Sequence, residues 1–473
     1  MKRVRLLFGL SAVTIVALVL TSCSPTTTPT PEVIKETVVV EERVEVEVPV
    51  EKTVEVIVTS APDLDQPARD VTIKVLTMQQ AGYTPEEMDT IASRFSAENA
   101  GVDVEVTYLS YDEIYDKLVT SISVGGRPPY DVILVDQPWV AQFVEAGWLM
   151  DITERVPEAY KAGIFDAGWN VTTVDGQIYG VPWMIDTKIF HYNTELLQAA
   201  GYDAPPTTWE EMEEMGLAMK EQGLVDYPVI WSWAQAEAAI CDFVVLLYGN
   251  GGQFFDENDR PAFNDARGVE VLTWMVESIE KGITNPSSIA AVEEDVRSVF
   301  SQGNAAFAIN WPYMYELANF DETESQITGQ VGLALNPVFD RGREEGIESA
   351  TVDGSMAFAI TSGSPHPDEA WAYLEFLVDK ITQMEFSAHL PPVWESAYLE
   401  PDLQVLLDQS PANEVLMPAF SQQFQYAHTR PKVPYYAEAS TLLQLALQEA
   451  LSGIKTAEQA LNDAAAAIEA IQK

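Results

Sequence analysis

The sequence predicts an α/β protein built around a largely parallel β-sheet. From residue 71 onward, segments with strand-like alternation take turns with segments of helical periodicity. Residues 130–135 (YDVILV) form a short and almost wholly apolar run, which is typical of a strand buried on both faces of a parallel sheet. The chain has 473 residues, 47% of them hydrophobic, which is enough for two domains with cores of their own.

The N-terminus has the features of a bacterial lipoprotein signal peptide. Basic residues precede an apolar stretch, residues 6–20, that is too short to span a bilayer. Residues 20–23 read Leu-Thr-Ser-Cys, so we expect residues 1–22 to be removed and Cys23 to be lipidated. An ordinary signal peptide that ends near a cysteine is the alternative. Lipidation would hold the mature protein at the extracellular face of a cell membrane, or in a periplasm.

Residues 23–69 have the composition of a spacer between this anchor and the globular part. They begin with a Thr/Pro tract and continue, over 38–58, with alternating valine and glutamate. The segment contains no aromatic residue, and Pro49 interrupts the alternation. We expect a charged, extended tether, and a β-rich stalk is the alternative.

The charge of the chain restricts its partners. The formal net charge is −47, which repels nucleic acid and anionic lipid. An anionic solute would need a local basic pocket against this field, so a neutral or cationic solute is favoured. Cys241, the only cysteine besides Cys23, lies in an apolar run and is interpreted as a buried small hydrophobe rather than a nucleophile.

The globular part opens with alternating strands and helices. We expect a strand over 71–77, a helix over 85–99, a strand over 102–109, a helix over 114–124 and the strand over 130–135.

Two short strands should then flank a turn at Gly176, before a rigid segment at Pro182 and a strand over 189–192. A helix should begin near Trp209, where Thr207 or Thr208 can act as the cap.

In this region the chain resembles the extracellular solute-binding proteins of ABC importers, in the maltose-type, family 1 branch. The most specific stretch is DGQIYGVPWMIDTKIFHYNTELLQAAGYDAPPTTWEEM at residues 175–212. Further matches are FSQGNAAF at 300–307, Trp311, and VDGS at 352–355, followed by an Arg-Pro pair that precedes the closing helices. The resemblance covers about residues 70–473.

The resemblance implies a two-lobed periplasmic-binding-protein-like fold of type II, with a ligand cleft between the lobes. Lobe 1 would comprise residues 70–184 and 338–394, and lobe 2 would comprise residues 185–337 and 395–473. Strands that cross between the lobes would form the hinge. The crossings are expected near residues 182–186, 336–339 and 391–398.

A sugar presents hydroxyl groups and an apolar CH face, so its site needs flat aromatic rings beside planar polar groups. From the resemblance and from places near predicted strand ends and hinges, we select ten candidate ligand-binding residues. They are Asp136, Trp139, Trp183, Asp186, Trp231, Trp233, Trp311, Asp353, Arg430 and Tyr436. Of Trp231 and Trp233, we expect one to face the ligand and the other to pack. Core packing is the alternative for each tryptophan, and a buried ion pair is the alternative for Asp136 and Arg430.

The function implied by the resemblance is that of the membrane-anchored binding component of an ABC importer. It would capture a di- or oligosaccharide by closure of its lobes and deliver it to the permease. We expect a monomer with no cofactor, metal or nucleic-acid partner and no catalytic residues.

Three alternatives remain open. The same fold could bind another solute, such as a peptide or a polyamine. The protein could be an exported glycoside hydrolase, which needs two carboxylates across one bond, although neither a Gly-x-Ser-x-Gly nor a His-Glu-x-x-His motif occurs. The spacer alone suggests a surface-layer component.

Overall fold

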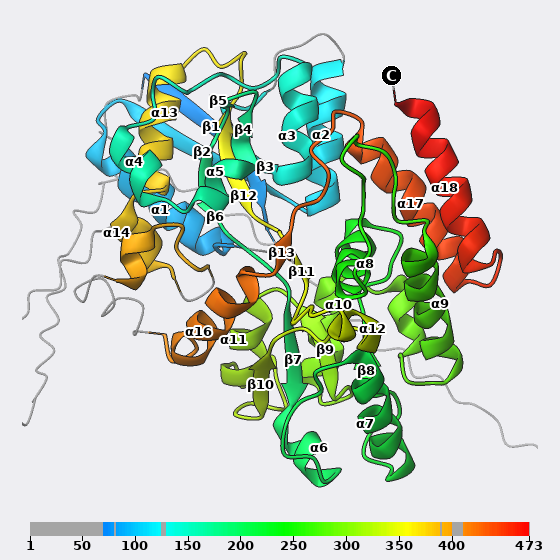
Figure 1. The fold of residues 1–473 in the computed structure, drawn as a ribbon. Coiled ribbons are helices and arrows are strands. Elements are labelled where there is room, and N and C mark those ends of the chain that lie inside the picture. The colour runs from blue at the N-terminus through cyan, green and yellow to red at the C-terminus, as the bar shows by residue number, and fades with distance from the viewer. Residues whose placement is uncertain (1–69, 80–81, 124–128, 388–389, 400–409, 473) are drawn as a thin grey trace, which may run out of the picture. The chain divides into compact units, whose positions relative to one another are not determined.

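The computed structural model in Figure 1 describes residues 70–79, 82–123, 129–387, 390–399 and 410–472. The chain divides into two units, Met1–Gln66 and Pro67–Lys473, and every described residue belongs to the second. The expected signal peptide, the lipidation site at Cys23 and the spacer lie outside the described residues. Within the described ranges, no helix has both the length and the apolar character that a membrane span requires.

The first lobe is built on a five-stranded sheet in the order β2-β1-β3-β12-β6. Its first three strands are parallel, and β12 runs antiparallel to both β3 and β6. The strands are β1 (Val71–Met78), β2 (Val102–Leu109), β3 (Val132–Asp136), β6 (Val181–Met184) and β12 (Met356–Ile360). Every residue of β3 is buried, as the apolar run at 130–135 predicted. Because β12 comes from far along the chain, this sheet is completed only after the chain has formed the sheet of the second lobe.

Helices of the first lobe form two packed groups. One pairs α1 with α13, and the other pairs α3 with α5. α1 begins after Thr84, whose side chain and Glu87 form a capping box, and it buries Met88, Ile91 and Phe95 on one face. The helices and short elements are α1 (Pro85–Glu98), α2 (Tyr111–Ser123), α3 (Gln137–Glu145), α4 (Glu158–Gly163), α5 (Asp166–Thr172), β4 (Thr173–Val174), β5 (Gln177–Ile178), α13 (Pro367–Leu377), α14 (Lys380–Glu385) and η2 (Glu395–Tyr398).

The second lobe has a four-stranded sheet in the order β10-β7-β9-β8. Its strands are β7 (Ile189–Asn193), β8 (Val229–Ile230), β9 (Phe307–Asn310) and β10 (Val331–Ala334).

The helices of the second lobe include two at the C-terminal end, which pack on each other and on α8 and α9 (Figure 1). They are α6 (Thr194–Ala199), α7 (Trp209–Glu221), α8 (Glu237–Gly249), α9 (Ala266–Glu280), η1 (Pro286–Ala290), α10 (Glu293–Ser301), α11 (Tyr313–Phe320), α12 (Asp340–Glu344), α16 (Asn413–Phe424), α17 (Tyr436–Leu451) and α18 (Ala457–Ile471). The expected cap of α7 is present at Thr208.

Three chain segments lie side by side between the two sheets. The first runs from β6 to β7, and its Thr187 pairs with Asp353 of the second segment. The second segment contains β11 (Thr351–Val352), which pairs in parallel with β13 (Ala427–His428) of the third. These segments form the hinge of the two-lobed fold that the sequence predicted.

One crossing differs from its expected position. The segment after Asn336 stays on the second lobe, because Val338 pairs with Thr208 and the ring of Phe339 packs on Trp274. The chain therefore crosses at 351–355 rather than at 336–339. Near the third expected crossing, the ring of Tyr398 still packs on Phe165 of the first lobe, whereas α16 packs on β7 and β10 of the second.

Candidate functional site

A cavity of about 300 Å³ lies where the strands of the first sheet end and the second lobe begins. Met78, Asp136 and Met184 are the last residues of β1, β3 and β6, and all three line it. Because β12 is antiparallel, its first residue, Met356, pairs with Asp136 and Met184 and lies at the same edge. This is the edge at which open α/β sheets place their ligands.

Helix N-termini supply most of the remaining wall. The lining residues at or beside the starts of α2, α3, α8, α10 and α11 are Tyr111, Asp112, Asp136, Glu237, Glu293, Glu294 and Tyr313. An N-terminus carries unpaired N–H groups and a partial positive charge, which explains why acidic residues are favoured there. Asp136, for example, accepts a hydrogen bond from the backbone N–H of Gln137 and caps α3.

Arg430 connects the two lobes through a buried ion network. Its guanidinium lies 2.9 Å from Asp136 of the first lobe and 3.0 Å from Glu237 of the second. The hydroxyl of Tyr111 donates to Asp136 at 2.5 Å, and that of Tyr436 donates to Glu237 at 2.5 Å. Burial raises the pKa of Glu237, and the guanidinium opposes this rise. The network therefore fixes two wall carboxylates, one from each lobe.

Asp186 lies at the hinge and lines the cavity with 7% of its surface exposed. Its carboxylate accepts a hydrogen bond from the backbone N–H of Thr187 at 2.8 Å. None of the ion pairs among the described residues includes it. Burial and the nearby carboxylate of Asp353 raise its pKa well above the usual value.

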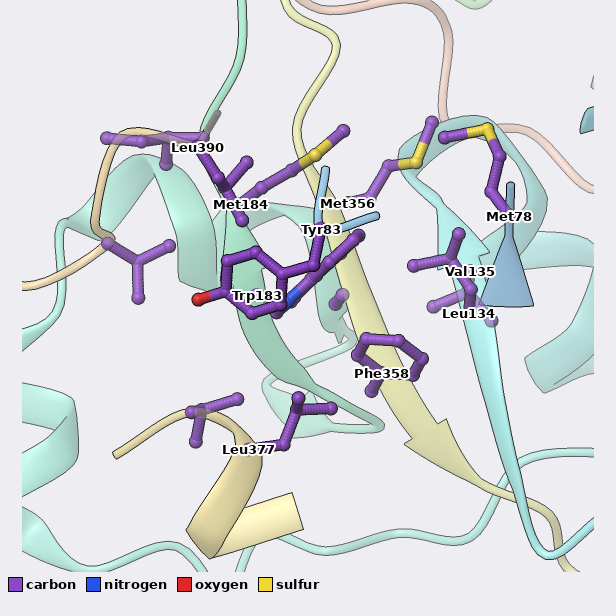
Figure 2. Close-up of a cluster of buried hydrophobic side chains, with 14 of the residues drawn as sticks. Met78, Tyr83, Leu134, Val135, Trp183, Met184, Met356, Phe358, Leu377 and Leu390 are labelled. Atoms are coloured by element: carbon purple, nitrogen blue, oxygen red, sulfur yellow. The ribbon is translucent and has the colours of Figure 1, made fainter. Parts of the chain in front are cut away.

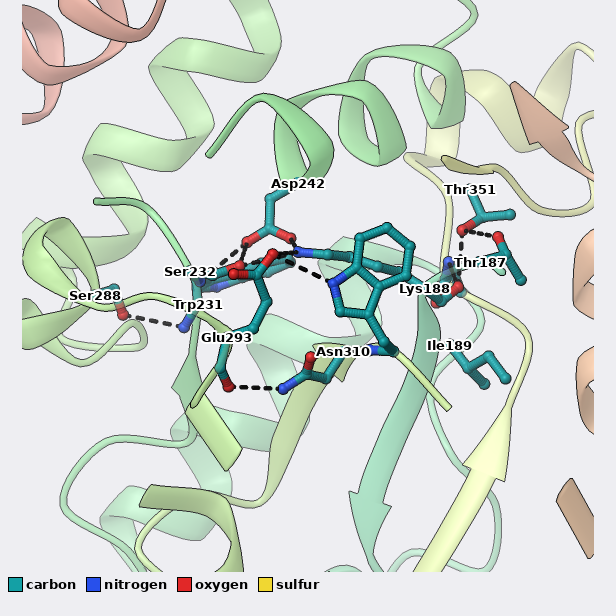
Figure 3. Close-up of polar contacts among 12 residues, drawn as sticks. Thr187, Lys188, Ile189, Trp231, Ser232, Asp242, Ser288, Glu293, Asn310 and Thr351 are labelled. Atoms are coloured by element: carbon teal, nitrogen blue, oxygen red, sulfur yellow. Dashed lines mark hydrogen bonds and ion pairs between the residues drawn. The ribbon is translucent and has the colours of Figure 1, made fainter. Parts of the chain in front are cut away.

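Trp311 is the large aromatic ring of the wall, and it contacts a polar cluster. The cluster includes Lys188, Asp242, Glu293 and Asn310, which Figure 3 shows. Its indole N–H donates to Glu293 at 3.3 Å, and its backbone N–H donates to Asn310 at 2.8 Å. The ammonium of Lys188 lies over the ring, 5.3 Å from its centroid. The same ammonium lies 2.7 Å from Asp242 and 3.5 Å from Glu293. Ring and carboxylate are thus held together by one buried cation.

Gly354 makes the close packing of Trp311 possible. A Cβ atom at this position would lie 2.3 Å from Cζ3 of the indole ring, well inside van der Waals contact. Gly354 itself lines the cavity beside the ring. The indole of the second lobe therefore rests directly on the hinge backbone.

Four of the candidate residues meet at this cavity: Asp136, Asp186, Trp311 and Arg430. Two more lie just behind it. Tyr436 orients Glu237, and Asp353 accepts a hydrogen bond from the backbone N–H of Ser355 at 2.9 Å. These two support the wall rather than form it.

Trp183 does not line the cavity but lies in the core of the first lobe with no exposed surface (Figure 2). Its ring packs edge-on against Tyr83 and Phe358, with centroids 5.5 and 5.0 Å away. Alternation along β6 explains this, because Trp183 and the cavity residue Met184 point to opposite faces.

The other tryptophans of the candidate set are also packed inside. Trp139 contacts the rings of Tyr111 and Tyr115, with centroids 4.8 and 5.5 Å away. Trp231 and Trp233 stack on each other at 5.2 Å and are 1% and 0% exposed. Neither lines the cavity, so the expected division into one ligand-facing and one packing ring is not what the structure has.

The cavity also contains residues that the sequence analysis did not select. They are chiefly Tyr111, Asp112, Glu237, Glu293 and Tyr313. A usable signal was present, because Tyr111 follows the end of β2, Glu237 follows β8 by a short loop, and Tyr313 follows β9. Applying the strand-end rule to every strand would have selected these positions.

Comparison with known families identifies the chain. The model of the bacterial extracellular solute-binding protein family matches residues 81–384. The chain belongs to this family. The resemblance stated from the sequence is thereby confirmed.

Solved structures share the two-lobed architecture of this solute-binding protein. The maltose-bound MalE3 of T. maritima is 28% identical and has a TM-score of 0.76, covering 84% of this chain and 99% of its own. A solute-binding protein of Thermotoga lettingae bound to α-D-tagatose is 27% identical with a TM-score of 0.72, covering 84% and 98%. The maltodextrin-binding protein MdxE of Bacillus subtilis is 25% identical over 83% of this chain and 88% of its own length. The α/β two-lobed fold is therefore confirmed.

Proposed function

We propose that this solute-binding protein is the sugar-binding component of an ABC importer. The observation that carries the proposal is the pairing of the Trp311 ring with carboxylates on one cavity wall. An indole face packs against the CH face of a sugar, and carboxylate oxygens accept bonds from its hydroxyls. Similar proteins with maltose, maltodextrin and tagatose in their names or titles support a carbohydrate ligand.

Ligand capture would proceed by closure of the lobes about the hinge. The first lobe contributes Tyr111 and Asp136 to the cavity, and the second contributes Trp311 and Tyr313. A ligand that contacts both walls binds the closed form more tightly than the open form, and so shifts the population toward closure. The permease of the importer would then recognise the closed form.

We infer that the protein is exported and anchored by a lipid on Cys23. The Leu-Thr-Ser-Cys sequence at 20–23 supports the anchor, and the extracellular family supports export. Residues 23–69 would give the binding domain reach above the membrane. The protein would act as a monomer, with the permease as its partner.

We further infer that the cavity binds its ligand without transforming it. Hydrolysis of a glycosidic bond requires a general acid and a second carboxylate across that bond. Here Asp136 and Glu237, one from each lobe, both contact Arg430. The matching family is one of solute-binding proteins, which supports a binding role.

Calorimetric titration of the purified protein tests the proposal. The ligands are maltose, trehalose, sucrose, cellobiose, xylobiose and spermidine, with chromatography of each mixture to detect products. One-to-one binding of a sugar without product supports the proposal. Absence of binding by all five sugars and by the amino sugars named below contradicts it, and product formation contradicts the non-enzymatic role.

A matched pair of variants locates the binding site. Trp311→Ala should weaken sugar binding by about 2 kcal/mol, roughly 30-fold, because a central aromatic anchor is lost. Trp371→Phe on α13, away from the cavity, should leave the affinity unchanged. Equal affinities for both folded variants would remove Trp311 from the site.

A further inference from the structure

The cavity wall carries far more negative than positive charge. Six carboxylates line it, and Arg430 is the one basic side chain among its described lining residues. The carboxylates are Asp112, Asp136, Asp186, Glu237, Glu293 and Glu294.

Most of these carboxylates have a counter-ion. Arg430 contacts Asp136 and Glu237, and Arg297 contacts Glu294 at 2.8 Å. Glu293 lies 3.5 Å from the ammonium of Lys188, which is closer to Asp242.

Asp112 and Asp186 take part in none of the ion pairs of the described residues. The side chain of Asp112 is exposed at the start of α2, whereas Asp186 is 93% buried against the hinge. Asp186 accepts one hydrogen bond, from the backbone N–H of Thr187, and the charge of Lys188 compensates it only through space, without an ion pair. A buried carboxylate without a cationic partner is costly, and a ligand cation would remove that cost.

Helix N-termini do not cancel this charge. Each supplies roughly half a positive charge, which accounts for the acidic first-turn residues of α2, α8 and α10. Asp186 lies between β6 and β7 in the chain and is not a first-turn residue of any helix, so this preference does not account for it.

The two lobes also face each other with like charge. Asp112 comes from the first lobe and Glu293 from the second, and both line the cavity. Burial raises the pKa of Asp112, and the charge of Glu293 adds to this rise. Like charges on opposite walls oppose closure, and a cation between them would favour it. The net charge of −47 adds a field that draws cations to the protein.

We propose that the solute is a sugar that carries a protonated amino group. The ammonium binds the carboxylate of Asp186, and Asp112 of the first lobe and Glu293 of the second lie on either side of it. This inference rests on the proposed sugar-binding function. The ring of Trp311 takes the CH face of the sugar, and the carboxylates take its ammonium. A charge-assisted hydrogen bond to Asp186 gives the selectivity over the neutral analogue.

Matched sugar pairs test the proposal on the intact protein. Cellobiose is compared with the β-1,4-linked glucosamine dimer, and glucose with glucosamine, at about pH 6, where the amines are protonated. The amino member of at least one pair should bind at least about tenfold more tightly at low salt, and a high salt concentration should reduce the difference. Spermidine serves as an amine without a sugar ring.

Each outcome has a distinct meaning. Equal or tighter binding of the neutral members overturns the amino-sugar inference and leaves the sugar-binding function standing. Binding of spermidine alone overturns both. Tight binding of an amino sugar, with weak binding of its neutral partner, supports both.

Variants of the cavity carboxylates test which residues cause the preference for the amino sugar. Asp186→Asn should remove most of the amino-sugar preference and change the affinity of the neutral partner much less. Asp112→Asn, at an exposed position, should reduce the preference and serves as the second variant where Asp186→Asn does not fold. Glu214→Gln, on the exposed side of α7, removes the same charge far from the cavity and should leave the preference intact. An unchanged preference in both folded cavity variants overturns the assignment.

Discussion

The ammonium of Lys188 lies over the ring of Trp311, 5.3 Å from the ring centroid. Lys188 directly precedes β7 and Trp311 directly follows β9, and Ile189 pairs with Asn310 where these strands adjoin. The two side chains are thus brought together by strand register at the hinge. The buried ammonium of Lys188, which belongs to the hinge segment, therefore contacts the aromatic wall of the cavity.

Lys188→Met should lower the free energy of unfolding by about 3–5 kcal/mol, because it leaves the buried carboxylate of Asp242 without its cation. Burial alone would lower the pKa of Lys188, but Asp242 and Glu293 outweigh it and keep the ammonium charged. Urea denaturation, followed by fluorescence, measures the change. The double variant Lys188→Met with Asp242→Leu should recover much of the loss, since no charge remains unpaired. A single variant as stable as the native protein would contradict this role.

Gly354→Ala should weaken ligand binding by about tenfold, because the added Cβ must displace the Trp311 ring. Gly249→Ala is the matched control, since its Cβ would meet only ordinary contacts at 3.6 Å or more. Titration with the best sugar ligand, together with thermal unfolding of both variants, separates affinity from stability. If the two variants bind equally well, the packing of Trp311 on the hinge does not control the site.

The α/β class could be predicted because its signals were local, whereas the two-lobed arrangement was implied by the family resemblance. The buried run at 130–135 and the helical spacing of Met88, Ile91 and Phe95 are visible in the chain itself. The second crossing was misplaced because it depends on a long-range contact. Val338 pairs with Thr208, and no local sequence pattern predicts that pairing.

The site could be predicted only in part, from residues at or shortly after the ends of strands. Asp136 and Trp311 follow strands, and both line the cavity. Trp183 lies one residue before the end of β6, and alternation turns it into the core. Whether a tryptophan faces a ligand or another ring is decided by tertiary packing, which is why Trp231 and Trp233 could not be assigned from sequence alone.

Arg430→Lys should destabilise the protein by about 2 kcal/mol. A single ammonium cannot replace the planar guanidinium, whose two terminal nitrogens contact Asp136 and Glu237. Differential scanning calorimetry measures the change. Arg94→Lys is the control, since Arg94 makes its ion pair with Glu385 at the surface and should change stability by less than about 0.5 kcal/mol. Equal effects of the two substitutions would mean that the network between the lobes contributes no more than a surface pair.

His191 should make stability depend on pH. Its ring is fully buried in β7, and burial lowers its pKa to about 4, although a hydrogen bond between Nδ1 and the carbonyl of Ile189 opposes this. The unfolded chain has a histidine pKa of about 6.5. Between these values the unfolded state binds more protons, so stability falls as the pH is lowered from about 6.5 to about 4. The full loss from this one group is about 3 kcal/mol.

His191→Phe isolates this contribution, since it keeps a ring in the core and removes the titrating group. The difference in unfolding free energy between the native protein and the variant should shift by up to about 3 kcal/mol across that pH range, in favour of the variant at low pH. Taking the difference cancels the titration of all other groups, including His428, whose pKa burial also lowers to about 4. Urea denaturation at closely spaced pH values gives both curves. Parallel curves would mean that His191 accepts its proton in the folded protein, so that its burial is not what lowers the stability in acid.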